Sequence, residues 1–136
     1  MTSRRGFLGM LLSSVPSAQL ATRPERVEGR RYLLNNCFIA GFQHHAGPTL
    51  LDHLTVGTPL ALVPEPENIY DKYAVRLEYN GHHVGYIPRE QNRTVSELLH
   101  QGAPISCTVT ARALKGPLWE AVRIEVSIPI AERSSE

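Results

Sequence analysis

The most regular pattern of apolar and polar residues in this chain lies within residues 68–90. Two alternating runs flank Asn80-Gly81, a pair that favours a two-residue type I′ turn because both residues tolerate positive φ. The pattern predicts a β-hairpin whose register is set by this turn, so that Val75 faces Tyr86. One face of the hairpin is largely apolar, and we expect it to point into the core: Val75, Leu77, Tyr79, His82, Val84 and Tyr86.

Four other stretches have the composition and alternation of short strands: residues 32–42, 59–64, 105–114 and 119–130. A helical pattern begins at Pro88 or Asn92 and ends at Gly102, and residues 48–54 predict one or two further helical turns. Closing such strands into a barrel removes exposed sheet edges. We therefore expect a mainly-β fold: a small OB-like or SH3-like β-barrel of five to six strands with one main α-helix.

The two ends of the chain do not share this alternation. Residues 1–21 carry Arg4-Arg5 before a short apolar run and resemble a twin-arginine export signal. Residues 22–31 are charged and aperiodic and indicate a tether, residues 32–130 form the predicted domain, and residues 131–136 are a polar tail. A working signal would place the protein in the periplasm or outside the cell. If the segment is instead an amphipathic helix, a cytoplasmic location is the alternative.

Composition and charge narrow the classes of function. With 136 residues, 42% of them hydrophobic, the chain suits one small domain. The net charge is +1, but six of the fourteen basic residues precede residue 32, and residues 37–128 hold seven basic against nine acidic residues. Strong, sequence-blind phosphate binding requires many Lys and Arg contacts. Any nucleic-acid site must therefore be small and local.

Cysteines and histidines leave two questions open. Cys37 and Cys107 fall on apolar faces of predicted strands, which indicates two buried thiols, or a disulfide if the chain is exported. His44-His45 and His82-His83 suggest zinc, but adjacent residues on a strand point to opposite faces, so neither pair can chelate as a unit. One histidine from each pair could still meet the other. Surface or hydrogen-bonded histidines are the alternative to a metal site.

The sequence lacks the common catalytic motifs. It contains no P-loop, no G-x-S-x-G elbow and no H-E-x-x-H motif. We therefore expect a binding module without cofactor rather than an enzyme. The enzymatic alternative is a zinc-dependent hydrolase acting on acid anhydrides or nucleic acid, built from His44, His45 and Asp71.

Three segments in this order carry a family resemblance: FIAGFQHHAG, EPENIYDKYAV and NGHHVGYIPRE, the last followed by a Leu-rich helix. From about residue 37 to residue 128 the chain resembles the HIRAN domain. The resemblance implies an OB-type barrel that binds the 3′ end of single-stranded DNA. Relatives in eukaryotes are fused to a DNA-remodelling ATPase, whereas similar bacterial domains also occur alone. A separate ATPase or nuclease is therefore the partner that the resemblance implies, in the context of DNA repair.

The resemblance also implies which residues contact nucleic acid: Gln43, His44, His45, Asn68, Tyr70, Asp71, Lys72 and Tyr86. Flat rings among them can stack on bases, Asp71 can accept a hydrogen bond from a terminal hydroxyl, and Lys72 can meet a phosphate. Gln43 stands where relatives carry a basic or polar residue, and His44 and His45 stand where tyrosines are common. These departures, with the acidic balance, favour the alternative of an exported interaction domain that kept the barrel and lost DNA binding. Trp119 is interpreted as a core or rim residue.

Overall fold

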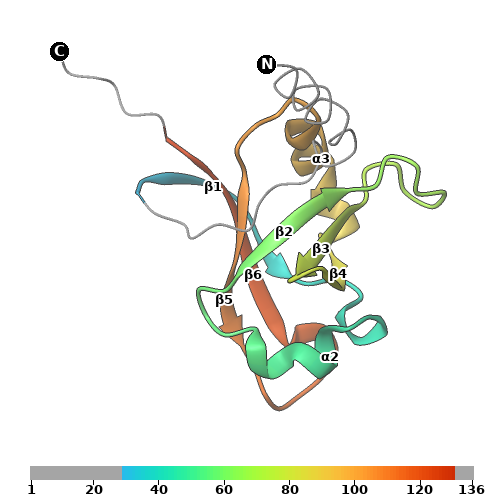
Figure 1. Cartoon of the computed structure of the whole chain (residues 1–136), viewed down its shortest axis with the longest axis vertical. Helices are drawn as coiled ribbons and strands as arrows, with labels where there is room; N and C mark the ends of the chain where they lie inside the picture. Colours follow the sequence, from blue (N-terminus) through green and yellow to red (C-terminus); the bar gives the residue numbers. More distant parts are fainter. Residues whose placement is uncertain (1–28, 131–136) are drawn as a thin grey trace, which may run out of the picture.

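The computed structural model describes residues 29–130, and these form a mainly-β domain (Figure 1). The predicted signal segment, most of the tether and the polar tail lie outside the described residues. The strands are β1 (Arg31–Phe38), β2 (Pro59–Pro64), β3 (Val75–Tyr79), β4 (His82–Tyr86), β5 (Ser106–Arg112) and β6 (Val122–Pro129). The α-helices are α2 (Gly47–Leu50) and α3 (Asn92–His100). Four 3-10 turns connect them: η2 (Phe42–His44), η3 (Leu51–His53), η4 (Arg89–Gln91) and η5 (Leu118–Glu120).

All six strands belong to one antiparallel sheet in the order β1-β6-β5-β2-β3-β4. This confirms the predicted fold class, but the barrel is not closed by a continuous strand pairing. The two edge strands, β1 and β4, are linked by a bridge between Ala40, which follows β1, and Tyr86 at the end of β4. Each of these residues donates its N–H to the other's carbonyl at 2.9 Å. Strand β1 begins at Arg31, one residue earlier than expected, and the Arg31 side chain donates to Ser127 Oγ at 2.7 Å.

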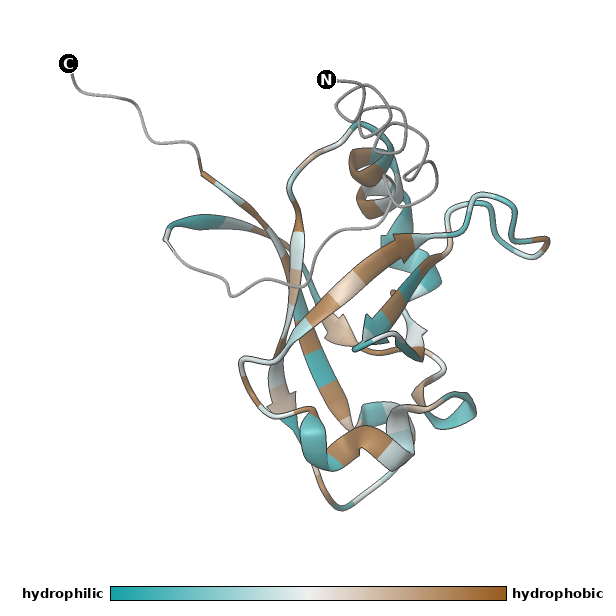
Figure 2. Cartoon of the chain, viewed as in Figure 1, coloured by the Kyte–Doolittle hydropathy of each residue, from teal (hydrophilic) through white to brown (hydrophobic). Residues whose placement is uncertain are grey.

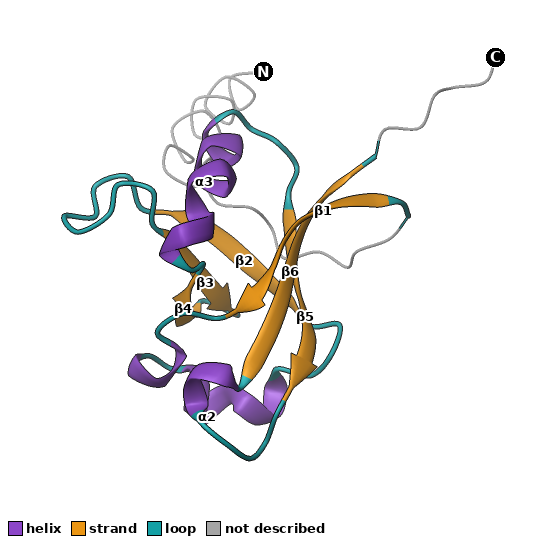
Figure 3. Cartoon of the chain, turned by 180° about the vertical axis from the view of Figure 1, so that it is seen from behind, coloured by secondary structure: helices purple, strands orange, loops and turns teal. Residues whose placement is uncertain are grey.

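The core lies inside the curved sheet and is covered at its two ends by helices. Strand β6 buries alternate residues, among them Val122, Ile124 and Val126, as its even-numbered apolar face predicts. Helix α3 lies at one end of the sheet and α2, with η3, at the other (Figures 1 and 3). Figure 2 shows apolar and polar residues alternating along strands such as β6. The helical spacing places Val95, Leu98 and Leu99 of α3 on one face; Val95 and Leu99 are buried, and Leu98 is partly buried against the core.

The predicted hairpin is present, but its register changes partway along. Asn80 and Gly81 have φ of 48° and 83°, as a type I′ turn requires. Beyond the first pairs, a β-bulge leaves one extra residue on β4, so Leu77 pairs with Gly85, and Arg76 pairs with Tyr86. The expected pairing of Val75 with Tyr86 is therefore wrong.

The bulge moves Tyr86 to the other side of the sheet. The Tyr86 hydroxyl donates to Glu65 Oε1 at 3.0 Å. Glu65 also accepts a hydrogen bond from Arg76, which pairs with Tyr86 on the adjacent strand. The prediction that Tyr86 belongs to the core face is thus corrected, because a one-residue shift exchanges the two faces of a strand. His82, also expected on the core face, is exposed beside the turn.

The two cysteines are free thiols in separate strands. Cys37 lies on β1 and Cys107 on β5, and β6 runs between them. Two strand spacings amount to about 9–10 Å, whereas a disulfide needs Cα atoms within about 7 Å of each other. This arrangement favours the two buried thiols over the disulfide suggested for an exported chain. Burial raises the pKa of Cys37 to about 11 and raises that of Cys107 further, so both thiols stay protonated near neutral pH.

Candidate nucleic-acid interface

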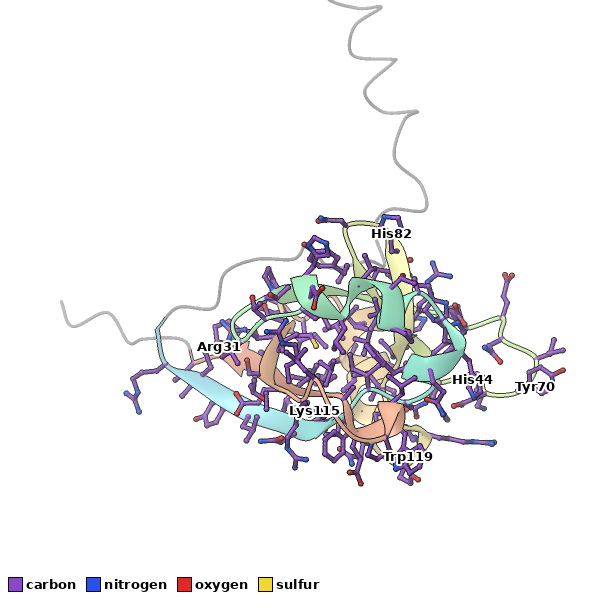
Figure 4. All side chains as sticks on the ribbon, turned by 90° about the horizontal axis from the view of Figure 1, so that it is seen from below. Arg31, His44, Tyr70, His82, Lys115 and Trp119 are labelled. Atoms are coloured by element: carbon purple, nitrogen blue, oxygen red, sulfur yellow. The ribbon has the colours of Figure 1, made fainter. Side chains whose placement is uncertain are left out.

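The loop between β2 and β3 is shaped by one asparagine. Asn68 Oδ1 accepts the backbone N–H groups of Tyr70 and Asp71 at 2.8 and 3.1 Å, which is an Asx-type turn. Asn68 Nδ2 donates to Glu65 Oε1 at 3.0 Å and fixes the turn to the end of β2. Because the turn is closed by these bonds, Tyr70 points away from the domain and is 81% exposed (Figure 4). The sequence therefore places an aromatic ring where a base can stack on it.

Asp71 is held between the loop and helix α3. Its Oδ1 accepts the N–H of Tyr73 at 2.9 Å, and its Oδ2 accepts Nδ2 of the buried Asn92 at 2.8 Å. Arg89 Nε lies 3.9 Å from the same Oδ2. A carboxylate oxygen can accept two hydrogen bonds. Asp71 is consequently fixed in position while retaining acceptor capacity toward a ligand.

Four of the predicted residues line one pocket of about 340 Å³: Asn68, Tyr70, Asp71 and Tyr86. We call it the Tyr70–Asp71 pocket. Its remaining walls come from the bridge residue Ala40, from the β3–β4 region and from two polar residues absent from the sequence prediction, Arg89 and Asn92. Arg89 follows the hairpin closely in sequence and Asn92 opens α3. The only signal in the sequence for Arg89 and Asn92 was that they follow the hairpin segment NGHHVGYIP.

Lys72 does not share this pocket. Its Nζ lies 5.3 Å from the centroid of the Tyr73 ring, and the residue lines a separate hollow beside α3 with His100. Arg89 is the basic residue that lines the Tyr70–Asp71 pocket, and its Nη2 donates to the Tyr70 carbonyl at 3.4 Å. The predicted phosphate contact of Lys72 is not tested by this geometry, which adds Arg89 as a basic residue next to Asp71.

Gln43 lies at a neighbouring pocket of about 390 Å³. This pocket shares Ala40 with the first and is also lined by Gln91 and Trp119. Trp119 is 59% exposed, so it is a rim residue as expected, and η5, which carries it, contacts η2. Gln43 Oε1 is buried without a hydrogen-bond partner among the described residues. The two pockets are therefore adjacent, with Ala40 in the wall of each.

His44 and His45 end the η2 turn and have different surroundings. His44 is exposed on the side of the domain from which Tyr70 projects (Figure 4). The His45 ring stacks on His83 with centroids 3.9 Å apart and 27° between the planes. One histidine of each pair therefore meets the other, as the alternation of strand faces allowed.

No three side chains of the metal-binding types gather around a common point within residues 29–130. The zinc-dependent hydrolase therefore remains a prediction without an assigned site. Within the same part of the chain, no helix is long and apolar enough to cross a membrane.

Comparison with known proteins places the fold in a family. The family model of the HIRAN domain matches residues 33–131. The crystal structure of a protein from Lactobacillus plantarum is similar, with a TM-score of 0.62 and 23% identity over 73% of this chain and 95% of that one. The crystal structure of the HIRAN domain of human HLTF has a TM-score of 0.54 and 19% identity over 75% of this chain and 81% of that one. No curated protein matches the sequence significantly. The fold and the match over residues 33–131 together show that the chain belongs to the HIRAN domain family.

Proposed function

We propose that this protein binds the 3′ end of a single-stranded nucleic acid in the Tyr70–Asp71 pocket. The HIRAN domain is a nucleic-acid-binding module, and recognition of one chain end is the finer step proposed here. The observation that carries it is the meeting of an exposed ring, a fixed carboxylate and an arginine, from Tyr70, Asp71 and Arg89, at one small pocket. On this proposal, an ATPase or nuclease that acts on the bound end would be a separate protein.

The size of the pocket favours an end over an internal stretch of nucleic acid. A volume of about 340 Å³ is at the lower limit of ordinary ligand pockets, which span roughly 300–1,000 Å³. Such a space suits one nucleoside stacked on Tyr70 rather than a strand entering and leaving. Stacking on one aromatic ring contributes about 1–3 kcal/mol and tolerates any base. Binding by this pocket should therefore depend weakly on the terminal base.

The chemistry of Asp71 favours a hydroxyl over a phosphate. A ribose or deoxyribose 3′ hydroxyl can donate to the carboxylate, whereas a 3′ phosphate brings a second negative charge against it. Arg89 is well placed for the phosphate that precedes the terminal nucleoside, because its side chain is 76% exposed and lies at the same pocket. The arrangement combines a hydrogen-bond acceptor for the 3′ hydroxyl, Asp71, with a cation for the preceding phosphate, Arg89.

Fluorescence anisotropy with 5′-labelled oligonucleotides tests the proposal on the full-length protein. We expect a 3′-hydroxyl oligonucleotide to bind at least about 10-fold more tightly than its 3′-phosphate counterpart, since a hydrogen bond to a charged group is at stake. With about one or two phosphate contacts, raising salt from about 50 to 200 mM should weaken binding only about 3- to 7-fold. Equal affinity for both ends, or no binding at low salt, would contradict the proposal.

Replacing Asp71 with Asn should remove this discrimination. The Asn side chain can still accept the Tyr73 N–H, but its amide would face Nδ2 of Asn92, so two donors meet. We expect the two oligonucleotides to bind within about 3-fold of each other and the free energy of unfolding to fall by about 1–3 kcal/mol. Urea denaturation measures the second effect.

Arg89→Gln serves as the comparison for Asp71→Asn. It should weaken binding of both oligonucleotides and reduce the salt dependence by about one phosphate contact, while the preference for the hydroxyl end persists. If Asp71→Asn keeps the full preference for the hydroxyl end, Asp71 does not read the end.

A further inference from the structure

We propose that His83, which is outside the set of expected contact residues, is a positioning residue for the ligand site, and that its neutral ring holds His45 and Tyr86 in their binding orientation. The inference rests on the proposed function, because both of these residues belong to the predicted interface. It adds the expectation that binding depends on the protonation state of His83, which the lining of neither pocket indicates.

The geometry places His83 at the centre of a cluster of three rings. Its ring stacks on His45 at 3.9 Å between centroids and meets Tyr86 edge to face at 4.8 Å and 87°. His45 and Tyr86 also contact each other, at 5.7 Å and 70°. Tyr86 lines the Tyr70–Asp71 pocket, and His45 is continuous in sequence with Gln43 at the neighbouring pocket. The cluster therefore reaches the Tyr70–Asp71 pocket through Tyr86, while His45 lies two residues along the chain from Gln43.

One hydrogen bond to a backbone carbonyl orients the His83 ring. Its Nε2 lies 3.1 Å from the carbonyl oxygen of Gly85, and since a carbonyl can only accept, this nitrogen carries the proton in the neutral ring. The His83 carbonyl accepts the N–H of Ala46 at 2.9 Å, which fixes the end of the η2 turn to β4. His83 thus contacts the turn through both its ring and its backbone.

The charges around this ring disfavour a proton on it. Partial burial opposes a positive charge on the ring most strongly, followed by His45 on the facing turn and Arg76 on β3, whereas the hydrogen bond to the Gly85 carbonyl favours it. Glu65 at the end of β2 acts the other way, but its carboxylate already accepts from Arg76 and Tyr86. Glu78, across the strand from His83, contacts Arg76 Nε at 2.8 Å. These surroundings lower the pKa of His83 below its ordinary value of 6.5.

The pKa of His45 is lowered as well, first by burial and then by the charge of His44. A histidine whose native pKa is lowered stabilises the folded arrangement fully above its ordinary pKa, and this contribution is lost as the pH falls below 6.5 toward the native value. Protonation of both rings would place two positive charges in stacked rings whose centroids are 3.9 Å apart. The η2 turn would then separate from Tyr86, and binding would weaken.

The test follows the affinity of the full-length protein for the 3′-hydroxyl oligonucleotide from about pH 8 to pH 5, near and below the ordinary histidine pKa. We expect wild type to weaken by about 2- to 10-fold, as for the loss of one or two ring contacts. His83→Phe keeps a flat ring but loses the titrating proton and the hydrogen bond to the Gly85 carbonyl, so it should bind somewhat more weakly than wild type at pH 8 and lose no further affinity at pH 5. His83→Ala should be weak throughout, and the exposed neighbour variant His82→Ala should follow wild type.

Several results would overturn the inference. One is the same pH profile for wild type and His83→Phe. Another is tighter binding on acidification, because the imidazolium would then act as a phosphate contact. Histidine NMR on the free protein gives a readout without ligand: the Tyr86 ring signals should shift in the same step as those of His83. Unmoved Tyr86 signals would also contradict the role.

The discrimination between 3′ ends at pH 7.5 separates the two proposals. If that discrimination holds and the pH profile does not depend on His83, the proposed function stands and the positioning role falls. If no oligonucleotide binds at any pH, both proposals fall.

Discussion

Gly85→Ala is expected to destabilise the domain by about 3–5 kcal/mol, a large part of the stability of a small domain. A methyl group at this position would lie 2.3 Å from Ile39 Cγ2 and 2.6 Å from the carbonyl oxygen of Ala40. The φ of Gly85 is +148°, which adds strain for any residue with a Cβ. The neighbouring backbone cannot retreat easily, because Ala40 is bonded to Tyr86 on both sides of the bridge. Urea denaturation followed by circular dichroism measures the loss.

Gly57→Ala is the matched control for this variant. Gly57 also has positive φ, +94°, but nothing lies within 4 Å of where its Cβ would be. It should therefore show the strain of the backbone alone, about 1–2 kcal/mol. If Gly85→Ala is no more destabilising than Gly57→Ala, the tight contact of the bulge with the segment after β1 does not contribute to stability.

Tyr70→Ala is expected to weaken binding of the 3′-hydroxyl oligonucleotide by about 5- to 100-fold, because it removes the ring on which the terminal base would stack. The side chain is 81% exposed, so the free energy of unfolding should change by no more than about 0.5 kcal/mol. Anisotropy titration and urea denaturation of the same preparation give both values. Tyr70→Phe should retain most of the affinity, since the stacking face is unchanged.

The adjacent Ile69 provides the comparison. It is 85% exposed on the same turn but does not line the Tyr70–Asp71 pocket. Ile69→Ala should therefore leave both affinity and stability near the wild-type values. Equal losses for Ile69→Ala and Tyr70→Ala would mean that the loop binds through general apolar contact, and unchanged affinity in Tyr70→Ala would remove the stacking role.

Local signals predicted much of the fold. The Asn80-Gly81 turn, the strand at 59–64 and the helix beginning at Asn92 are set by residues close in sequence, and the structure has each of them. The bulge on β4 was not predictable in this way. It depends on how closely Gly85 approaches Ile39 and Ala40, which lie on a distant part of the chain. Because one extra residue exchanges strand faces, this single non-local contact decided where Tyr86 points.

The site was predictable to the extent that one loop determines it. The residues of the Asx-type turn, Asn68 to Asp71, are adjacent in sequence, and their hydrogen bonds are local. Lys72 follows a turn with no fixed period, so its direction could not be inferred from spacing. Arg89 and Asn92 reach the pocket only because α3 packs beside the loop. Such contributions come from tertiary packing, which a linear pattern does not encode.

The bridge between Ala40 and Tyr86 has a mechanical consequence. The two sheet edges come together at this bridge, and both of its residues line the Tyr70–Asp71 pocket. A molecule bound in that pocket would contact both residues of the bridge and oppose their separation, since a ligand that prefers the bridged form shifts the population toward it. We therefore expect a ligand in this pocket to stabilise the contact between the two sheet edges.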